Sequence, residues 1–368
     1  MSASASAAAA AATAASSARP DVDVIVVGGG PIGLAAAIEA RMRSLSVVVV
    51  EPRSSAIDKA CGEGLMPGAV PALARLGVDP QGFPLRGVSY RDATRRVDHL
   101  FSSGEGRGVR RTTLHAALHA RAVSLGVEFA DARVDSLSQG AETVTVAGIA
   151  GRYLLGADGL HSSVRRLAGL ERAISPGGRR FSLRQPDRRF GLRRHFAMEP
   201  ESDLIEVYWT PTVEAYLTPV GDGVVGIAVL GRPGANFAAS IASIPQLERR
   251  IRGRSPASSL RGAGPFRQRT TSRVAGRVML VGDASGYVDA ITGEGIRVGL
   301  AQARAAIECV AADVPRRYER AWSSSTRDFR VLTGGLVGVA MSPLRGAIVP
   351  AAASLPRVFG AVVERLAR

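Results

Sequence analysis

The sequence predicts an α/β fold, in which a Rossmann-like dinucleotide-binding domain carries an inserted mixed or antiparallel β-sheet domain. A nearly continuous apolar run, residues 23–27, enters a glycine-rich turn and is followed by a helical segment and a second apolar run. Two later segments, at residues 156–159 and 282–284, again place Gly and Asp directly after an apolar run. Between them, short segments from residue 204 to 230 alternate in polarity, as antiparallel strands do.

Residues 24–51 are predicted to form one βαβ unit, with strands at 23–27 and 47–50 and a helix at 34–43. The glycines at positions 28, 30 and 33 match G-x-G-x-x-G, a pattern that lets the backbone approach a pyrophosphate at a helix N-terminus. Glu51, at the end of the second strand, can accept hydrogen bonds from ribose hydroxyls and disfavours a 2′-phosphate. The unit therefore suits FAD or NAD and not NADP.

The other predicted elements follow in chain order. The expected helices span residues 111–125, 241–251 and 296–312. The expected strands span residues 127–129, 143–146, 153–156, 204–209, 215–220, 224–230 and 278–281, with a hairpin at 220–223. Residues 104–108, which are rich in glycine, are expected to be a flexible link, and residues 177–189, which are rich in Arg, Gly and Pro, are expected to be a loop.

These elements predict a discontinuous domain organisation. Residues 1–20, almost all Ala and Ser, are expected to be a disordered tail. The dinucleotide-binding domain is assigned to residues 21–85, 108–172 and 275–330, and the substrate domain to residues 86–107 and 173–274. Residues 331–368 are expected to form a C-terminal helical segment. Its apolar stretch at 331–341 is either a buried terminal helix or a surface that contacts lipid or an apolar substrate.

Composition excludes several classes of function. The net charge is +15, but the excess is arginine spread along the chain, and Lys59 is the only lysine. Because the basic residues do not cluster with aromatic ones, nucleic-acid binding is not expected, whereas attraction to an anionic membrane surface or cofactor is plausible. The two cysteines have no zinc spacing, so no metal is expected. We expect a cytoplasmic protein, with membrane association as an open alternative.

The ordered set of motifs carries a family resemblance. Residues 28–33, then 156–165, then 282–284 with 292–295 resemble the flavin hydroxylase superfamily, which includes para-hydroxybenzoate hydroxylase and geranylgeranyl reductase. The similarity covers most of residues 21–330. It implies the para-hydroxybenzoate hydroxylase fold, bound FAD, and NADH or NADPH as the electron donor.

The resemblance also implies roles for single residues. Asp283 matches an aspartate that bonds a ribityl hydroxyl, Arg111 matches an arginine that contacts FAD, and the turn at 292–295 matches the loop under the isoalloxazine ring. Asp158 could equally be a turn residue or a helix cap, as could Asp283. The expected cofactor contacts are Gly28, Gly30, Pro31, Ile32, Gly33, Glu51, Arg53, Cys61, Arg111, Asp158, Gly159, Gly282, Asp283, Thr292, Gly293, Gly295 and Ile296.

Candidate catalytic side chains are few. Residues 59–67 resemble the cysteine-glycine loop of the geranylgeranyl reductase branch, so Cys61 is either a catalytic candidate or a small packing residue. His195 could act as an acid or base near neutral pH, or could be an ordinary sheet residue. Tyr208, Trp209 and Tyr216 form either an aromatic substrate wall or part of the core.

Three functions stay open at this point. The segment from Arg194 to Pro219 resembles flavin monooxygenases, which implies hydroxylation of an aromatic or polyketide and phenolic-lipid type substrate by O2 through a flavin hydroperoxide. A lipid-tailed aromatic compound is one such substrate. Gly286, Ala290 and Ile296 depart from the aromatic hydroxylase pattern and favour a reductase that saturates isoprenoid double bonds. A non-catalytic flavoprotein is the second alternative.

Overall fold

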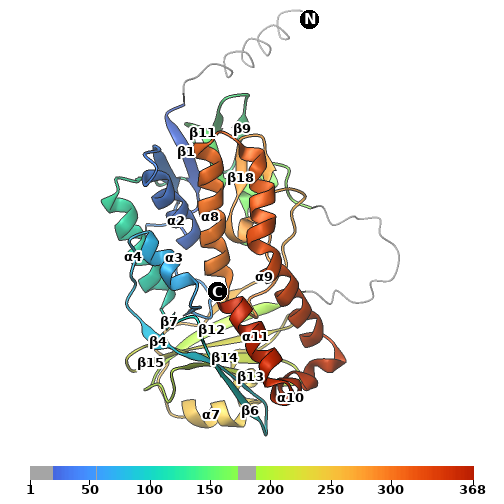
Figure 1. Ribbon diagram of the computed structural model, residues 1–368. Coiled ribbons are helices and arrows are strands. Elements are labelled where there is room, and N and C mark those ends of the chain that lie inside the picture. The colour runs from blue at the N-terminus through green and yellow to red at the C-terminus, as the bar shows by residue number, and fades with distance from the viewer. Residues whose placement is uncertain (1–19, 55, 173–187) are drawn as a thin grey trace, which may run out of the picture.

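The computed structural model describes residues 20–54, 56–172 and 188–368, and its strands form three sheets (Figure 1). The largest sheet has eight strands and follows the order β17-β18-β11-β1-β2-β8, with β10 paired to β11 and β9 paired to β10. Strand β1 lies parallel to both β2 and β11, and β8 and β18 continue the parallel pairing on either side. The strands are β1 (Val22–Val27), β2 (Val47–Val50), β8 (Glu128–Ala130), β9 (Ser138–Gln139), β10 (Val144–Val146), β11 (Ile149–Gly156), β17 (Val274–Ala275) and β18 (Val278–Leu280).

Both faces of this sheet are covered, which explains why its central strands are apolar throughout. Val24 and Val26 pack into one core cluster, whereas Ile25 and Val27 pack into another on the opposite face. The first cluster is closed by helices α2 (Pro31–Arg41), α3 (Ala69–Arg75), α4 (Arg111–Ser124) and α8 (Gly295–Ala311). The α2 and α8 helices pack directly on one another, so residues from the two ends of the dinucleotide-type domain share one core.

The second sheet has seven strands in the order β16-β12-β15-β14-β13-β5-β6 (Figure 1). It is antiparallel except for the parallel pair of β5 and β13. Its strands are β5 (Gly87–Arg91), β6 (Arg96–Leu100), β12 (Phe190–Ala197), β13 (Leu204–Trp209), β14 (Glu214–Gly221), β15 (Val224–Gly231) and β16 (Arg261–Ala263). The hairpin between β14 and β15 confirms the turn predicted at 220–223.

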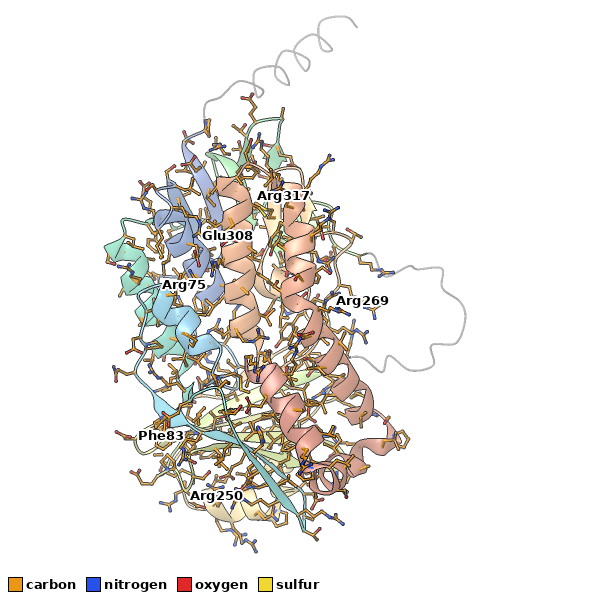
Figure 2. The ribbon with its side chains drawn as sticks, in the orientation of Figure 1. Arg75, Phe83, Arg250, Arg269, Glu308 and Arg317 are labelled. Carbon is orange, nitrogen blue, oxygen red and sulfur yellow. The ribbon has the colours of Figure 1, made fainter. Side chains whose placement is uncertain are left out.

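Two short helices cover the outer face of the seven-stranded sheet. Helix α6 (Phe237–Ala242) and helix α7 (Pro245–Ile251) replace the single helix expected at 241–251. That expectation was wrong because Ile244, directly before Pro245, adopts φ −122° and ψ 84°, and a residue before proline is disfavoured in the α region. Arg250 of α7, labelled in Figure 2, reaches the sheet and pairs with Glu206 at 2.6 Å.

A third, three-stranded sheet joins the two larger ones. It consists of β3 (Gly64–Leu65), β4 (Phe83–Leu85) and β7 (Gly106–Gly108), in the order β3-β7-β4. Residues 106–108 therefore form a strand and not part of a flexible link, which corrects the expectation for 104–108. Gly108 has no room for a side chain, since a Cβ there would lie 1.6 Å from the Pro219 carbonyl oxygen of β14.

The C-terminal part of the chain is helical. Helix α9 (Tyr318–Ala340) begins beside the first core cluster and ends beside the seven-stranded sheet, and the chain then turns back (Figure 1). The remaining elements are η3 (Pro343–Ala347), α10 (Ile348–Ser354) and α11 (Pro356–Ala367). No single helix in the described residues has the length and apolar character to cross a membrane.

The predicted fold class is confirmed: a mixed α/β protein in which a parallel, dinucleotide-type sheet carries an inserted sheet domain. The domain boundaries stay a prediction. The expected tail, apart from Pro20, and most of the expected loop at 177–189 lie outside the described residues.

Candidate functional site

A cavity of about 890 Å³ lies between the carboxyl ends of β1 and β2 in the eight-stranded sheet and one face of the seven-stranded sheet. Its lining includes every cofactor contact predicted from the sequence except Gly33. Residues that are far apart in the chain, such as Gly30, Asp158 and Asp283, therefore meet in one place. The cavity has a polar part beside the glycine-rich turn and an apolar part beside the inserted sheet.

The glycine-rich turn is shaped by contacts that exclude side chains. Gly28 has φ +109°, and a Cβ there would lie 2.7 Å from the Ala157 carbonyl oxygen of the neighbouring strand end. A Cβ on Gly33 would lie 1.8 Å from the Gly28 carbonyl oxygen, so the turn can pack this close to the start of α2 only because residue 33 is glycine. Gly30 precedes α2 and Pro31 opens it, which points the free amides of the helix start at the cavity.

Glu51 is held in place at the end of β2. Its Oε2 accepts a hydrogen bond from the Gly29 amide at 2.8 Å, and its Oε1 accepts one from Arg53 Nε at 2.6 Å. Burial alone would raise the pKa of Glu51, but the hydrogen bonds from Arg53 and Gly29 outweigh it and lower the pKa. The carboxylate is therefore ionised near neutral pH and able to accept from ribose hydroxyls.

Arg111 contributes positive charge to the polar part, together with Arg53 and Lys59. Its side chain reaches the glycine-rich turn, because Nη2 lies 3.9 Å from the position that a Cβ on Gly30 would take. Its buried Nε has no hydrogen-bond partner among the described residues. An unpaired guanidinium nitrogen beside a helix N-terminus fits the pyrophosphate of a dinucleotide.

Asp158 and Asp283 differ in their surroundings. Asp158 Oδ2 accepts from the amides of Ser163 at 2.6 Å and Val164 at 3.1 Å, so it does cap helix α5 (Ser163–Leu167). Its other oxygen, Oδ1, is buried without a partner in the described structure and remains available to a ligand. Burial raises the pKa of Asp283, and the charges of Arg111 and Lys59 oppose this rise.

The turn predicted to lie under the flavin ring precedes helix α8. Thr292 contacts Thr333 of α9 through their hydroxyl oxygens at 3.0 Å, and Gly293 has φ +72°. Glu294 lies outside the cavity lining, is buried, and pairs with Arg297, whose Nε lies 3.1 Å from Glu294 Oε2. Burial raises the pKa of Glu294 to about 7, although the Arg297 charge acts in the opposite direction.

A buried polar network that the sequence did not predict lies against the cavity. Glu63 Oε2 lies 2.6 Å from His195 Nε2, and Glu63 Oε1 accepts from the Arg111 amide at 2.8 Å. Arg193 Nη1 lies 3.1 Å from His195 Nδ1. A guanidinium can only donate, so Nδ1 accepts and the ring proton on Nε2 is donated to Glu63.

This network changes the roles expected for two residues. His195 does not line the cavity and is only 1% exposed, so it can act on a ligand only through Glu63, which does line it. The Glu63 carboxylate thus pairs with His195 and not with Lys59, the charged neighbour in its own segment. What marks Glu63 in the structure is its backbone conformation: its φ is +59°, which is uncommon for a residue other than glycine.

Cys61 lines the cavity, and its Sγ accepts from the Glu63 amide at 3.4 Å. Burial raises the pKa of the thiol, which keeps it protonated near neutral pH and weak as a nucleophile. These properties favour the packing role over the catalytic one.

The apolar part of the cavity is built on the inner face of the seven-stranded sheet and on α11. Its aliphatic and aromatic lining includes Val88, Ile205, Val207, Ala228, Leu230, Phe266, Val363 and Leu366. Of the expected aromatic wall, only Tyr216 lines the cavity, and its hydroxyl donates to the Ile291 carbonyl at 2.9 Å. Tyr208 faces the opposite side of the sheet and donates to Glu206 at 2.5 Å, and Trp209 packs beneath Arg345.

Comparison with known proteins agrees with this site. Residues 21–182 match a family described as "FAD binding domain". A menaquinone reductase of Mycolicibacterium smegmatis is 28% identical over 81% of this chain and 78% of its own length. A rifampicin monooxygenase of Streptomyces venezuelae is 26% identical over 76% of this chain and 62% of its own length.

Solved structures show the same fold. A triple mutant of a flavin-dependent brominase has a TM-score of 0.76 at 17% identity and covers 94% of both chains. A flavoprotein/dehydrogenase from Cytophaga hutchinsonii has a TM-score of 0.73 at 18% identity, with 86% of this chain and 85% of that one covered.

The fold and site thus define an FAD-binding flavoprotein of the para-hydroxybenzoate hydroxylase type. The chain contains an FAD-binding domain and is similar to FAD-dependent monooxygenases and geranylgeranyl reductase-like enzymes, and it is an FAD-dependent oxidoreductase.

Proposed function

We propose that the protein is an NAD(P)H-dependent monooxygenase that hydroxylates an aromatic or polyketide-derived substrate with a large apolar part. The observation that carries this proposal is that the FAD cradle and an apolar chamber form one continuous cavity. A reacting carbon can then lie against the flavin turn at 292–295 while the rest of the substrate packs on the inserted sheet. Bound FAD would accept electrons from the nicotinamide donor and activate O2.

The side chains of the chamber suit such a substrate. The wall formed by Val207, Leu230 and Phe266 excludes water, which protects reactive oxygen chemistry from hydrolysis. Burial raises the pKa of Tyr90 to about 12 and that of Tyr287 well above its usual range. Both phenols therefore stay protonated near neutral pH and can donate a hydrogen bond to a phenol or ketone oxygen.

Oxygen consumption tests this proposal directly. We expect NAD(P)H oxidation by the FAD-loaded protein to accelerate at least about tenfold when a phenolic or polyketide substrate is added, with electron transfer coupled to product. Reaction under labelled O2 should place the label in the hydroxylated product. Conversion of the substrate without O2, to a product with two more hydrogens, would contradict monooxygenation.

Reduction of an isoprenoid double bond is the second candidate, and one observation favours it. Saturating a double bond requires a proton in addition to a hydride, and the pair of Glu63 and His195 places a proton-carrying group against the cavity. The similarity to a menaquinone reductase over most of both chains points the same way.

Replacing the carboxylate separates the two candidates. For a reductase, Glu63→Gln should lower substrate turnover about 100-fold or more while the reduction of FAD by NAD(P)H changes little. For the proposed monooxygenase, the same variant should change hydroxylation only a few-fold. Glu105→Gln, at an exposed position, is the matched control and should leave both rates unchanged.

A further inference from the structure

The C-terminal helices expose an unusual share of large apolar side chains. Among the described residues, the exposed ones between 331 and 362 are Val331 (65%), Val339 (37%), Leu344 (65%), Leu355 (56%), Val358 (57%) and Val362 (38%). They lie on α9, on η3, at the junction of α10 and α11, and on α11, and these four consecutive elements pack against one another (Figure 1). We call these six residues the C-terminal apolar surface. An exposed apolar patch on a folded protein usually marks an interaction site.

The only charged side chains between residues 331 and 363 are arginines. From residue 331 to residue 363 the sequence contains no Asp, Glu or Lys. Its two arginines are Arg345, which is buried and pairs with Glu214 at 2.6 Å, and Arg357, which is exposed. The flanking residues of α9 and α11 include two acidic side chains, and both have partners: Asp328 pairs with Arg365 at 2.6 Å, and Glu364 lies 2.9 Å from His99. The flanking arginines are Arg327, Arg330, Arg365 and Arg368, so basic groups outnumber acidic ones at the border of the surface.

The same elements are fixed to the fold by their inner faces. Phe329, Thr333 and Ala340 of α9 are buried, and so are Val349 of α10 and Val363 of α11. The α9 segment and the following helical segment, 315–340 and 343–354, are bent by 101° at their break. Helices whose inner faces are already packed would have to leave the core to cross a bilayer, whereas their outer faces can lie in its interface.

The inner side of the surface reaches the cavity. Val363 and Leu366 of α11 line its apolar part, while Val358 and Val362, on the same helix, face outward. One helix thus separates the substrate chamber from the exposed apolar surface. This arrangement suits a ligand that is stored in lipid.

We infer that the C-terminal apolar surface docks the protein on an anionic lipid bilayer, with α11 at the interface. The lack of acidic groups between residues 331 and 363 and the excess of arginines at its border favour negatively charged headgroups, since basic residues near an anionic membrane surface are attracted to it. Between residues 331 and 363 a second copy of the chain would find no carboxylate to pair with Arg357. The inference goes beyond the proposed oxidation chemistry and holds whichever reaction the flavin performs.

Vesicle binding tests the inference on the full, FAD-loaded chain. The test variant is Leu344→Glu with Leu355→Glu and Val358→Glu, and the matched control is Met42→Glu with Val123→Glu and Leu260→Glu, three exposed apolar positions elsewhere. We expect wild type and control to co-sediment with vesicles of mixed phosphatidylglycerol and phosphatidylcholine. The test variant should lose binding at least about tenfold. Flavin absorbance and the melting temperature verify that each variant is folded.

A second measurement covers the case in which the triple variant does not fold. Val358→Trp is a single, surface-exposed change, and its emission should be quenched by brominated lipid in the anionic vesicles. The inference is overturned if wild type does not bind, if neutral phosphatidylcholine vesicles bind it equally well, or if the folded test variant binds as wild type does. It is also overturned if Val358→Trp is not quenched, or if the test variant converts a dimer to a monomer, because the surface would then join two copies.

Discussion

At the scale of single residues, the site depends on glycines at positions where a side chain would collide with the neighbouring backbone. Gly28 and Gly33 were predictable, because the G-x-G-x-x-G spacing after a strand encodes local geometry. Asp158 and Asp283 were predictable from their position at strand ends. The pair of Glu63 and His195 was not, because its partners are 132 positions apart: Glu63 lies just before β3, whereas His195 lies in β12. No local pattern reports which carboxylate a distant histidine will meet.

The close contact behind the turn gives a prediction about cofactor binding. In Gly33→Ala the added methyl group would lie 1.8 Å from the Gly28 carbonyl oxygen, so the turn or helix α2 must move. We expect FAD affinity to fall at least about tenfold, measured by titration of the apoprotein. Gly140→Ala, where a Cβ meets nothing within 4 Å, should bind FAD as wild type does. Equal affinity in both variants would contradict the role assigned to Gly33.

At the scale of elements, hydrophobic pattern located most strands and helices but not their interruptions. The strand at 204–209 and the hairpin at 220–223 were predicted, since alternating polarity and a Gly-Asp-Gly turn are local features of the sequence. The break at Ile244 and the pairing of Gly106–Gly108 with β3 and β4 were missed. Gly108 looks like a flexible residue in the sequence, yet it is glycine because β14 passes too close for a side chain.

The start of α8 gives a prediction about pH. Burial raises the pKa of Glu294 to about 7, from an ordinary value of 4.5. The folded state therefore binds this proton more tightly than the unfolded state, so the stabilisation is complete below about pH 4.5 and is lost as the pH rises through about 7. We expect the free energy of unfolding of wild type, minus that of Glu294→Gln, to fall by about 2 kcal/mol from about pH 5 to about pH 8.

Denaturant unfolding at several pH values measures this difference. Glu142→Gln, at an exposed position, serves as the control and should show no comparable change relative to wild type. A difference between wild type and Glu294→Gln that is flat across the range, or that grows with pH, would show that the carboxyl is not held protonated by burial at the start of α8.

At the scale of the whole molecule, the sequence predicted a dinucleotide-binding domain with an inserted sheet domain, but not how the substrate space is formed. Tyr216 lines the chamber, whereas Tyr208 does not, because Tyr208 faces the opposite side of the sheet. Trp209 lies on the inner face with Ile205 and Val207, but it packs against Tyr90 and Arg345 outside the chamber lining. The contribution of α11 to the chamber could not be predicted, since it depends on the C-terminal helices folding back across the inserted sheet.

The central claim is that one FAD lies across this molecule, with its adenosine side at Glu51, its pyrophosphate at Gly30 and Arg111, and its ring at the turn before α8. Titration of the apoprotein with FAD and with FMN, which lacks the adenosine half, tests this most directly. The account predicts one FAD per chain and at least about 100-fold weaker binding of FMN, because the βαβ unit would contribute little to FMN. Equal affinity for the two flavins, or no saturable binding of FAD, would contradict it.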